Sequence, residues 1–242
     1  MRLALYFMLG KQHISLSALT ILPFLVIYLM YGTGKFTNFY IILFVAVIIG
    51  SLIPDCDCKG KPKLAYDFEP IYKLMIPLQW VTINIFKISK IKTKLKLNYE
   101  VKAEHRGIMH SPVGILISSS LLTMVFTIIL FLLKLLSGYV FFAIFFGLII
   151  GQFLHLIQDS MTVSGINWSF PFNDRNFIKG NIRTWDRENK IPSYFIGILI
   201  IIFIGLMMGI IFNYIPVNFM TYIGMIFLYI LIWLIFLLVS KR

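Results

Sequence analysis

The most informative pair of polar residues in this sequence is His155 and Asp159, which lie four positions apart near the end of a long apolar segment. On a helix, residues i and i+4 share a face and lie about 6 Å apart along the axis. An imidazole and a carboxylate placed in this way can bind one metal ion or two adjacent ions, or the carboxylate can orient the imidazole. The alternative is a polar helix end with no catalytic or metal-binding role, but polar groups buried in an apolar run favour a functional role.

A second polar group lies in the segment His105-Arg106-Gly107-Ile108-Met109-His110. A spacing of five does not put the two histidines on one helical face, so the motif requires a turn, which Gly107 permits. His110 then stands at the start of the next apolar helix, where the positive end of the helix dipole attracts anions. Arg106 could clamp such an anion through two hydrogen bonds. A basic loop before a helix is the alternative interpretation.

A third group is the run Pro54-Asp55-Cys56-Asp57, which directly follows an apolar segment. Two carboxylates within three residues suit a hard or borderline divalent cation. The alternative is a helix end with solvated acids. Cys56 and Cys58 are the only cysteines of the chain, so a four-cysteine zinc site and a disulfide framework are excluded, and thiolate ligation is not expected.

Six apolar segments are long enough to position these groups in a membrane. A helix needs about 20 mainly apolar residues to cross the hydrocarbon core, and 59% of this sequence is hydrophobic. The expected spans are Ile14–Tyr31, Phe39–Ile53, Pro112–Leu136, Tyr139–Ile157, Ser193–Tyr214 and Val217–Ser240. The sequence therefore predicts an all-α, polytopic membrane bundle. We expect one domain over residues 1–242, with the motifs in residues 10–190 and the C-terminal spans in residues 193–240.

The basic residues lie on one side of this six-span arrangement. The net charge is +12, and the lysines and arginines gather at both termini and in the loops 54–110 and 159–191, whereas the turns near Ser137 and Ile215 have none. The positive-inside rule places that side in the cytoplasm, and all four histidines lie at the same end of the spans. The excess of basic residues favours contact with membrane lipids and their anionic headgroups. Direct nucleic-acid binding is not expected, because no aromatic–basic module accompanies the charge.

Two further patterns concern packing. The segment Ile71–Phe86 is apolar but interrupted by Pro77, which predicts an interfacial or partly re-entrant helix rather than a full span. The basic run Lys87–Lys96 follows it. Small residues four apart, in Gly147–Gly151 and in Gly205–Gly209, allow close contacts between helices and are typical of a helix bundle.

In their order along the chain, these motifs resemble a known family. They are the histidine before the first span (His13), IGSLIPDCD after the second, HRGIMHSPVG opening the third and GQFLHLIQDSMTVSGINWSFPF closing the fourth. Together they resemble the YdjM-like family of inner-membrane metal-dependent hydrolases, which are distantly similar to zinc-dependent phospholipase C. The resemblance implies an inner-membrane location and phosphoester substrates. It also matches Pro171-Phe172, followed by the basic Arg175, whereas Met109 stands where a small polar residue is usual.

The function we expect is metal-dependent hydrolysis at the cytoplasmic membrane face, on a phospholipid or a lipid-linked phosphate. The expected cofactor is zinc, with manganese or magnesium as alternatives. His13 and His105 would be further ligands or acid–base groups, while Arg106 and Arg175 would bind the anionic substrate and stabilise charge in the transition state. The expected metal ligands are Asp55, Asp57, His110, His155 and Asp159.

Two other function classes compete with this hypothesis. The chain could be a non-enzymatic membrane anchor whose metal is structural and whose basic loops recruit a cytoplasmic or nucleic-acid-associated partner. A cation-coupled or proton-coupled transporter is disfavoured, because no histidine, aspartate or glutamate lies in the middle of a span, where transporter sites are usually found.

Overall fold

Six long helices form the membrane bundle of this protein. The computed structural model describes residues 10–57, 69–93, 107–172, 176–183 and 190–241, and within them six helices are long and apolar enough to cross a membrane. The expected all-α, six-span architecture is therefore confirmed, with helix ends that differ by a few residues. The helices are α1 (Gly10–Tyr31), α2 (Thr37–Gly50), α5 (Pro112–Leu132), α6 (Gly138–Ser160), α7 (Ile191–Ile211) and α8 (Phe219–Val239).

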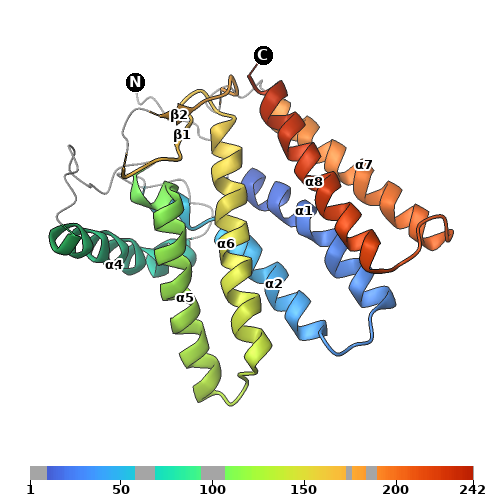
Figure 1. The fold of residues 1–242 in the computed structure, drawn as a ribbon, viewed down its shortest axis with the longest axis horizontal. Helices are drawn as coiled ribbons and strands as arrows, with labels where there is room; N and C mark the ends of the chain where they lie inside the picture. Colours follow the sequence, from blue (N-terminus) through green and yellow to red (C-terminus); the bar gives the residue numbers. More distant parts are fainter. Residues whose placement is uncertain (1–9, 58–68, 94–106, 173–175, 184–189, 242) are drawn as a thin grey trace.

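The six helices are arranged around α6. Helices α2 and α5 flank α6, α1 lies behind it, and the hairpin of α7 and α8 covers the other side of α1 (Figure 1). We call the end of the bundle where α6 ends and α1 and α5 begin the site end. The segment after α6 closes this end: strand β1 (Ile166–Asn167) pairs antiparallel with β2 (Phe177–Ile178), and Asn181 Nδ2 donates to the Lys241 carbonyl just after α8 (2.9 Å). Which side of the membrane the site end faces stays a prediction.

Among the described helices, α2 and α6 make the most extensive contact. A Cβ added to Gly147 would lie 2.6 Å from the Ala46 Cβ, and one added to Gly151 would overlap the Val47 carbonyl oxygen. The predicted small-residue contact is confirmed for this pair of glycines. Gly205–Gly209 makes no such contact within the described residues, where a Cβ at Gly205 would have no atom within 4 Å and one at Gly209 would meet only the side chain of Ile215, in the turn after the same helix.

We expect Gly151→Ala to destabilise the bundle by about 1–3 kcal/mol, the usual cost of overpacking a close contact. The added methyl group would push α2, and with it the segment that follows α2, away from α6. Thermal unfolding in detergent measures the loss, and Gly197→Ala in α7 is the matched control, since its Cβ would have no atom of the described residues within 4 Å. Equal melting temperatures for the two variants would contradict this account of the contact.

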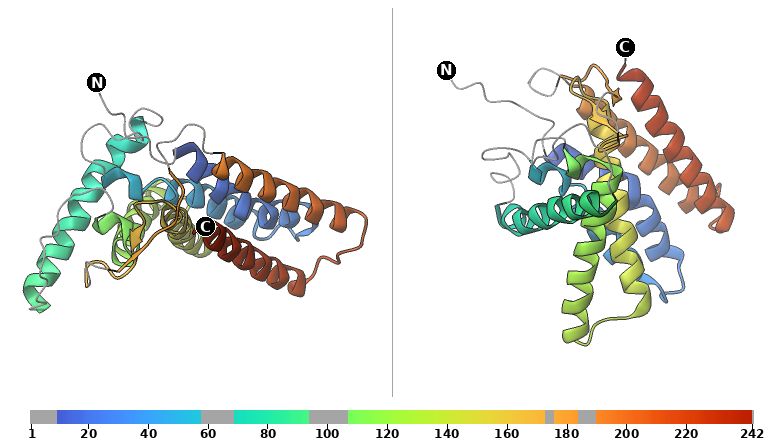
Figure 2. Two further views of the ribbon diagram at one scale, coloured as in Figure 1. Left: turned by 90° about the horizontal axis from the view of Figure 1, so that it is seen from above. Right: turned by 60° about the vertical axis from the view of Figure 1, so that its left-hand side comes forward.

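Helix α4 (Glu69–Thr93) lies across the site end of α5, at the edge of the molecule opposite α7 and α8 (Figures 1 and 2). Its apolar stretch, Met75–Ile85, is too short to cross a membrane. Trp80 is 68% exposed, while Met75 and Leu78 are buried. The predicted helix is confirmed; its position at the membrane interface stays a prediction, and the end of the basic run after Thr93 lies outside the described residues.

The buried face of α4 supports two short 3₁₀ helices, η1 (Pro54–Asp57) and η2 (Ile108–His110). Met75 and Leu78 belong to the same hydrophobic cluster as Ile53 of the α2–η1 connection and Met109 of η2. Burial of these side chains fixes η1 and η2 against each other. Helix α4 therefore holds in place the two segments that carry Asp55 and His110.

Candidate metal centre

His155 and Asp159 lie in the last two turns of α6 and are both buried. The His155 Nδ1 atom lies 2.8 Å from the backbone carbonyl oxygen of Ser51, at the end of α2. A carbonyl oxygen can only accept, so Nδ1 carries the proton and Nε2 presents its lone pair. This Nε2 lies 3.9 Å from Asp159 Oδ2. A contact from the neighbouring helix thus orients the imidazole as a ligand.

Asp55 and His110 come from η1 and η2. The His110 Nε2 atom lies 3.8 Å from Asp55 Oδ1 and 3.6 Å from Asp159 Oδ2, and His155 Nε2 lies 3.5 Å from the same Asp55 oxygen. The turn that places His110 is fixed locally: the Ser111 hydroxyl donates to the Ile108 carbonyl (2.7 Å) and accepts from the Gly114 backbone N–H (3.0 Å), capping α5.

His13, in the first turns of α1, joins the same cluster. Its Nε2 lies 3.7 Å from Asp159 Oδ1, and its ring stacks on that of His155 with 4.0 Å between centroids. The His13 Nδ1 lies 2.7 Å from Gln158 Oε1, and the Gln158 amide nitrogen donates to the Ser17 hydroxyl (3.1 Å). Because Gln158 Oε1 accepts a hydrogen bond from the His13 Nδ1–H group, the Nε2 lone pair of His13 faces Asp159. The geometry favours a ligand role for His13 over an acid–base role.

The distances within the cluster fit ligands that share a cation. The five imidazole-to-carboxylate separations are 3.5–3.9 Å, longer than a hydrogen bond of about 2.7–3.2 Å. Two atoms each about 2.1 Å from one ion, at a tetrahedral angle, lie roughly 3.4 Å apart. Two overlapping groups have ligand atoms within 4.8 Å of one another: His13, His155 and Asp159, and Asp55, His110 and His155.

The donor set also fits the expected metal. Imidazole nitrogens and carboxylate oxygens are common zinc ligands, and carboxylates alone would favour harder ions. The Asp159 carboxylate is buried and that of Asp55 is half-buried, and a buried carboxylate is strongly destabilising unless positive charge compensates it. A divalent cation among the five side chains would supply that charge. The two Asp159 oxygens face different histidines, so this carboxylate suits either a single ion or a bridge between two.

The structure does not describe the side chains of the other predicted catalytic, metal-binding and substrate-binding residues. Asp57 ends η1, and its side chain lies outside what the structure describes. His105, Arg106 and Arg175 also lie outside the described residues. Cys56 is buried in the hydrophobic cluster and belongs to neither ligand group within the described part of the chain.

Sequence reasoning missed Gln158 and the Ser51 carbonyl. Gln158 is a buried polar residue in the same apolar run as His155 and lies three positions after it. The criterion that selected His155, a polar group in an apolar segment, could have selected Gln158 as well. The Ser51 carbonyl has no sequence signal, because every residue carries a backbone carbonyl.

We expect Gln158→Leu to lower zinc affinity by about 10–100-fold, the usual effect of losing a residue that orients a ligand. The change removes the acceptor that holds His13 Nδ1. Zinc affinity is measured by competition with a chelator. Gln152→Leu is the matched control: Gln152 is also buried in α6, but it binds Ser118 and Ser119 (both 2.7 Å) and lies outside the cluster. Similar zinc affinities for the two variants would contradict the role given to Gln158.

Comparison with known proteins identifies the family. A model of the YdjM inner membrane protein family matches residues 8–242, so the chain belongs to this family and is a multi-pass inner membrane protein. The match confirms the predicted resemblance and extends it through the C-terminal spans. No curated protein and no solved structure matched the chain.

Proposed function

We propose that this member of the YdjM inner membrane protein family is a metal-dependent hydrolase that acts on a phosphoester at the cytoplasmic membrane face. The observation that carries the proposal is the convergence of three histidines and two aspartates from four separate segments of the described chain. Their ligand atoms face one another rather than solvent. Hydrolysis is the reaction class for which such nitrogen and oxygen ligand sets are commonly used.

The residues of the cluster would hold the cation and orient its ligands. His155 and Asp159 hold the cation from α6, while Ser51 and Gln158 fix the imidazoles of His155 and His13. Asp55 has 17% of its side chain exposed, whereas His110 and His155 are fully buried, so the Asp55 side is the open side of the cluster. A bound divalent cation would lower the pKa of a coordinated water and polarise the scissile group.

The place of the cluster supports a lipid phosphoester as substrate. The ligands lie at the ends of membrane spans, where headgroups meet the hydrocarbon core. The basic termini and loops belong to this end of the spans, and each juxtamembrane lysine or arginine adds about 1 kcal/mol of attraction to an anionic leaflet. Arg106 and Arg175 would bind the phosphate, as the sequence motifs predict.

The anchor hypothesis remains a second candidate for one specific reason. His13, His110 and His155 are each at most 1% exposed, and closed sites are typical of structural zinc, whereas catalytic zinc keeps one position open. Cobalt substitution separates the two. Inorganic phosphate added to the cobalt-loaded protein should change its visible spectrum if a position is open. An unchanged spectrum, together with no turnover of a phospholipid or a generic phosphodiester by the zinc-loaded or manganese-loaded protein, would favour the anchor.

A further inference from the structure

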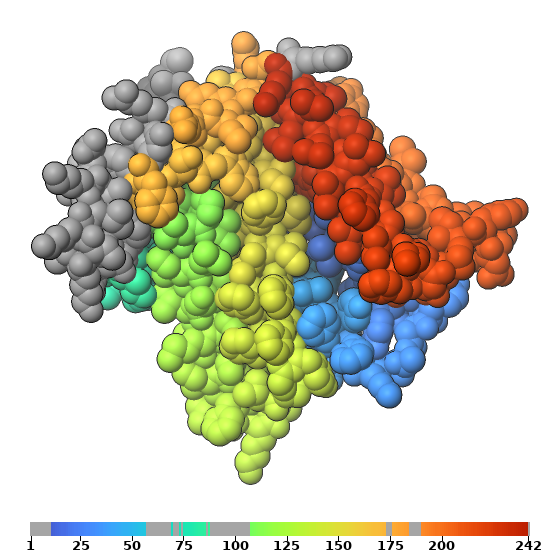
Figure 3. Space-filling view, viewed as in Figure 1, coloured from blue at the N-terminus to red at the C-terminus, as the bar shows by residue number. Residues whose placement is uncertain are grey.

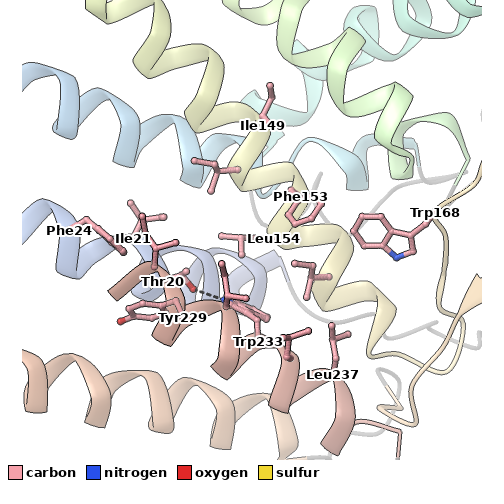
Figure 4. Close-up of a pocket in the computed structure, with 15 residues that line it drawn as sticks. Thr20, Ile21, Phe24, Ile149, Phe153, Leu154, Trp168, Tyr229, Trp233 and Leu237 are labelled. Carbon is pink, nitrogen blue, oxygen red and sulfur yellow. Dashed lines mark hydrogen bonds between the residues drawn. The ribbon is translucent and has the colours of Figure 1, made fainter. Parts of the chain in front are cut away.

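An apolar groove of about 620 Å³ runs between α1, α6 and α8 (Figure 4). Thr20 and Phe24 of α1 form its base, Phe153 and Leu154 come from α6, and Trp233 comes from α8. In the space-filling view, α1 is visible between α6 and α8 (Figure 3). A volume of this size lies within the range of about 300–1,000 Å³ that ligand pockets occupy.

The polar atoms around the groove already have hydrogen-bond partners. Trp233 Nε1 donates to the Thr20 hydroxyl (3.3 Å), and the Tyr229 hydroxyl donates to the Leu19 carbonyl (3.4 Å). Trp168, at the site end, donates its Nε1 proton to the Ser160 hydroxyl (2.9 Å). What remains is a nearly continuous apolar lining, which suits a hydrocarbon ligand and disfavours water.

The length of the groove matches one leaflet of a bilayer. Its lining runs from Ile149 to Ile157 on α6 and from Ile226 to Leu237 on α8, which correspond to about 12 and 16 Å of helix. Both ranges lie towards the site end of helices that cross the membrane. Half of a hydrocarbon core of about 30 Å is about 15 Å.

The groove approaches the metal centre along α1. His13 and Thr20 are seven residues apart, so they lie on nearly the same face of α1, with about 10 Å between them along the axis. Ser17 lies between them and accepts the hydrogen bond from Gln158 (3.1 Å), which also contacts His13 (2.7 Å). On α6, Leu154 of the groove directly precedes His155 of the centre. A chain in the groove would thus leave its headgroup at the level of the centre.

We propose that this groove holds one hydrocarbon chain of a phospholipid from the leaflet at the site end. That this phospholipid is also the substrate rests on the proposed function. A lipid chain is the matching occupant, because the groove is apolar, one leaflet long and flanked by membrane spans.

The test uses the full-length protein in phospholipid vesicles that contain a phospholipid with a photoreactive acyl chain. The metal is removed by chelation, so no turnover is needed. Two variants are compared with the wild type, Ile230→Trp and Leu231→Trp. These neighbours on α8 are similarly exposed, at 52% and 55%. Of the two, Ile230 lines the groove and Leu231 does not.

In the wild type we expect the label to concentrate on groove residues such as Phe153 and Trp233. Ile230→Trp should reduce the labelling of these groove residues about fourfold for each methylene group that the indole excludes. Leu231→Trp should leave the labelling unchanged. Equal labelling of all lipid-facing surfaces, equal behaviour of the two variants, or a cross-link between two protein chains at the groove would overturn the proposal.

A turnover measurement separates this proposal from the function on which it rests. With zinc restored, Ile230→Trp should lower hydrolysis of a long-chain phospholipid and spare a short-chain, water-soluble phosphodiester. Selective labelling without turnover of any phosphoester would contradict the hydrolase function and still support lipid binding in the groove. Turnover of phospholipid without selective labelling would contradict lipid binding in the groove.

Discussion

His155→Ala should abolish phosphoester hydrolysis while the protein still inserts into the membrane. The His155 imidazole lies within 3.5 Å of Asp55 and 3.9 Å of Asp159 and is shared by both ligand groups of the centre. Losing a residue that only orients a ligand already costs about 10–100-fold, so losing the ligand itself should cost more than about 100-fold. Asp159→Ala should have the same effect, because its two oxygens face His13 and His110.

Insertion gives the internal control for these variants. It depends on the apolar runs, which neither change interrupts, so membrane-extracted yield and elution in detergent should match those of the wild type. Phe146→Ala, an exposed position on the same helix, should keep both turnover and zinc content. Wild-type turnover in His155→Ala, measured on phospholipid and on a generic phosphodiester, would exclude the centre from the reaction.

Removal of the metal should cause the second large effect. Chelation should stop hydrolysis and also lower the melting temperature, because the buried Asp159 carboxylate, the half-buried Asp55 carboxylate and three buried imidazoles would lose the cation between them. A ligand present at 1,000 times its dissociation constant stabilises a protein by about 4 kcal/mol. Thermal unfolding with and without chelator measures that difference.

Two controls sharpen the chelation experiment. Zinc or manganese added back should restore both the melting temperature and the turnover, and the Asp159→Ala protein should not respond to chelation. Hydrolysis that survives chelation would contradict a metal mechanism. A melting temperature that falls while the wild type shows no turnover on any ester, amide or phosphoester would favour a structural metal.

Local patterns in the sequence predicted the spans and most of the centre. Long apolar runs identify membrane helices because hydrocarbon tolerates few polar groups. The pair His155 and Asp159 shares a face by helix geometry alone. The sequence also predicts that Asp55 and His110 lie near this pair, because their segments follow or precede spans at the same end of the bundle.

Contacts between distant segments could not be predicted in the same way. The orientation of His155 depends on the Ser51 carbonyl, 104 residues away, and that of His13 on Gln158, 145 residues away. The support that α4 gives to η1 and η2 is also a packing contact between separate segments. Gly205–Gly209 shows the converse: the spacing allows a close helix contact, but no helix packs there within the described residues.

X-ray absorption spectroscopy of the purified, zinc-loaded protein, with metal content measured on the same sample, tests the metal centre most directly. We expect at least one zinc per chain in a shell of nitrogen and oxygen atoms at about 2.0–2.2 Å, with imidazole scattering that decreases in His155→Ala. Sulfur in the shell would point to Cys56 or Cys58 instead. A protein that binds no divalent metal at stoichiometric levels, or a spectrum unchanged by His155→Ala, would contradict the centre formed by His13, Asp55, His110, His155 and Asp159.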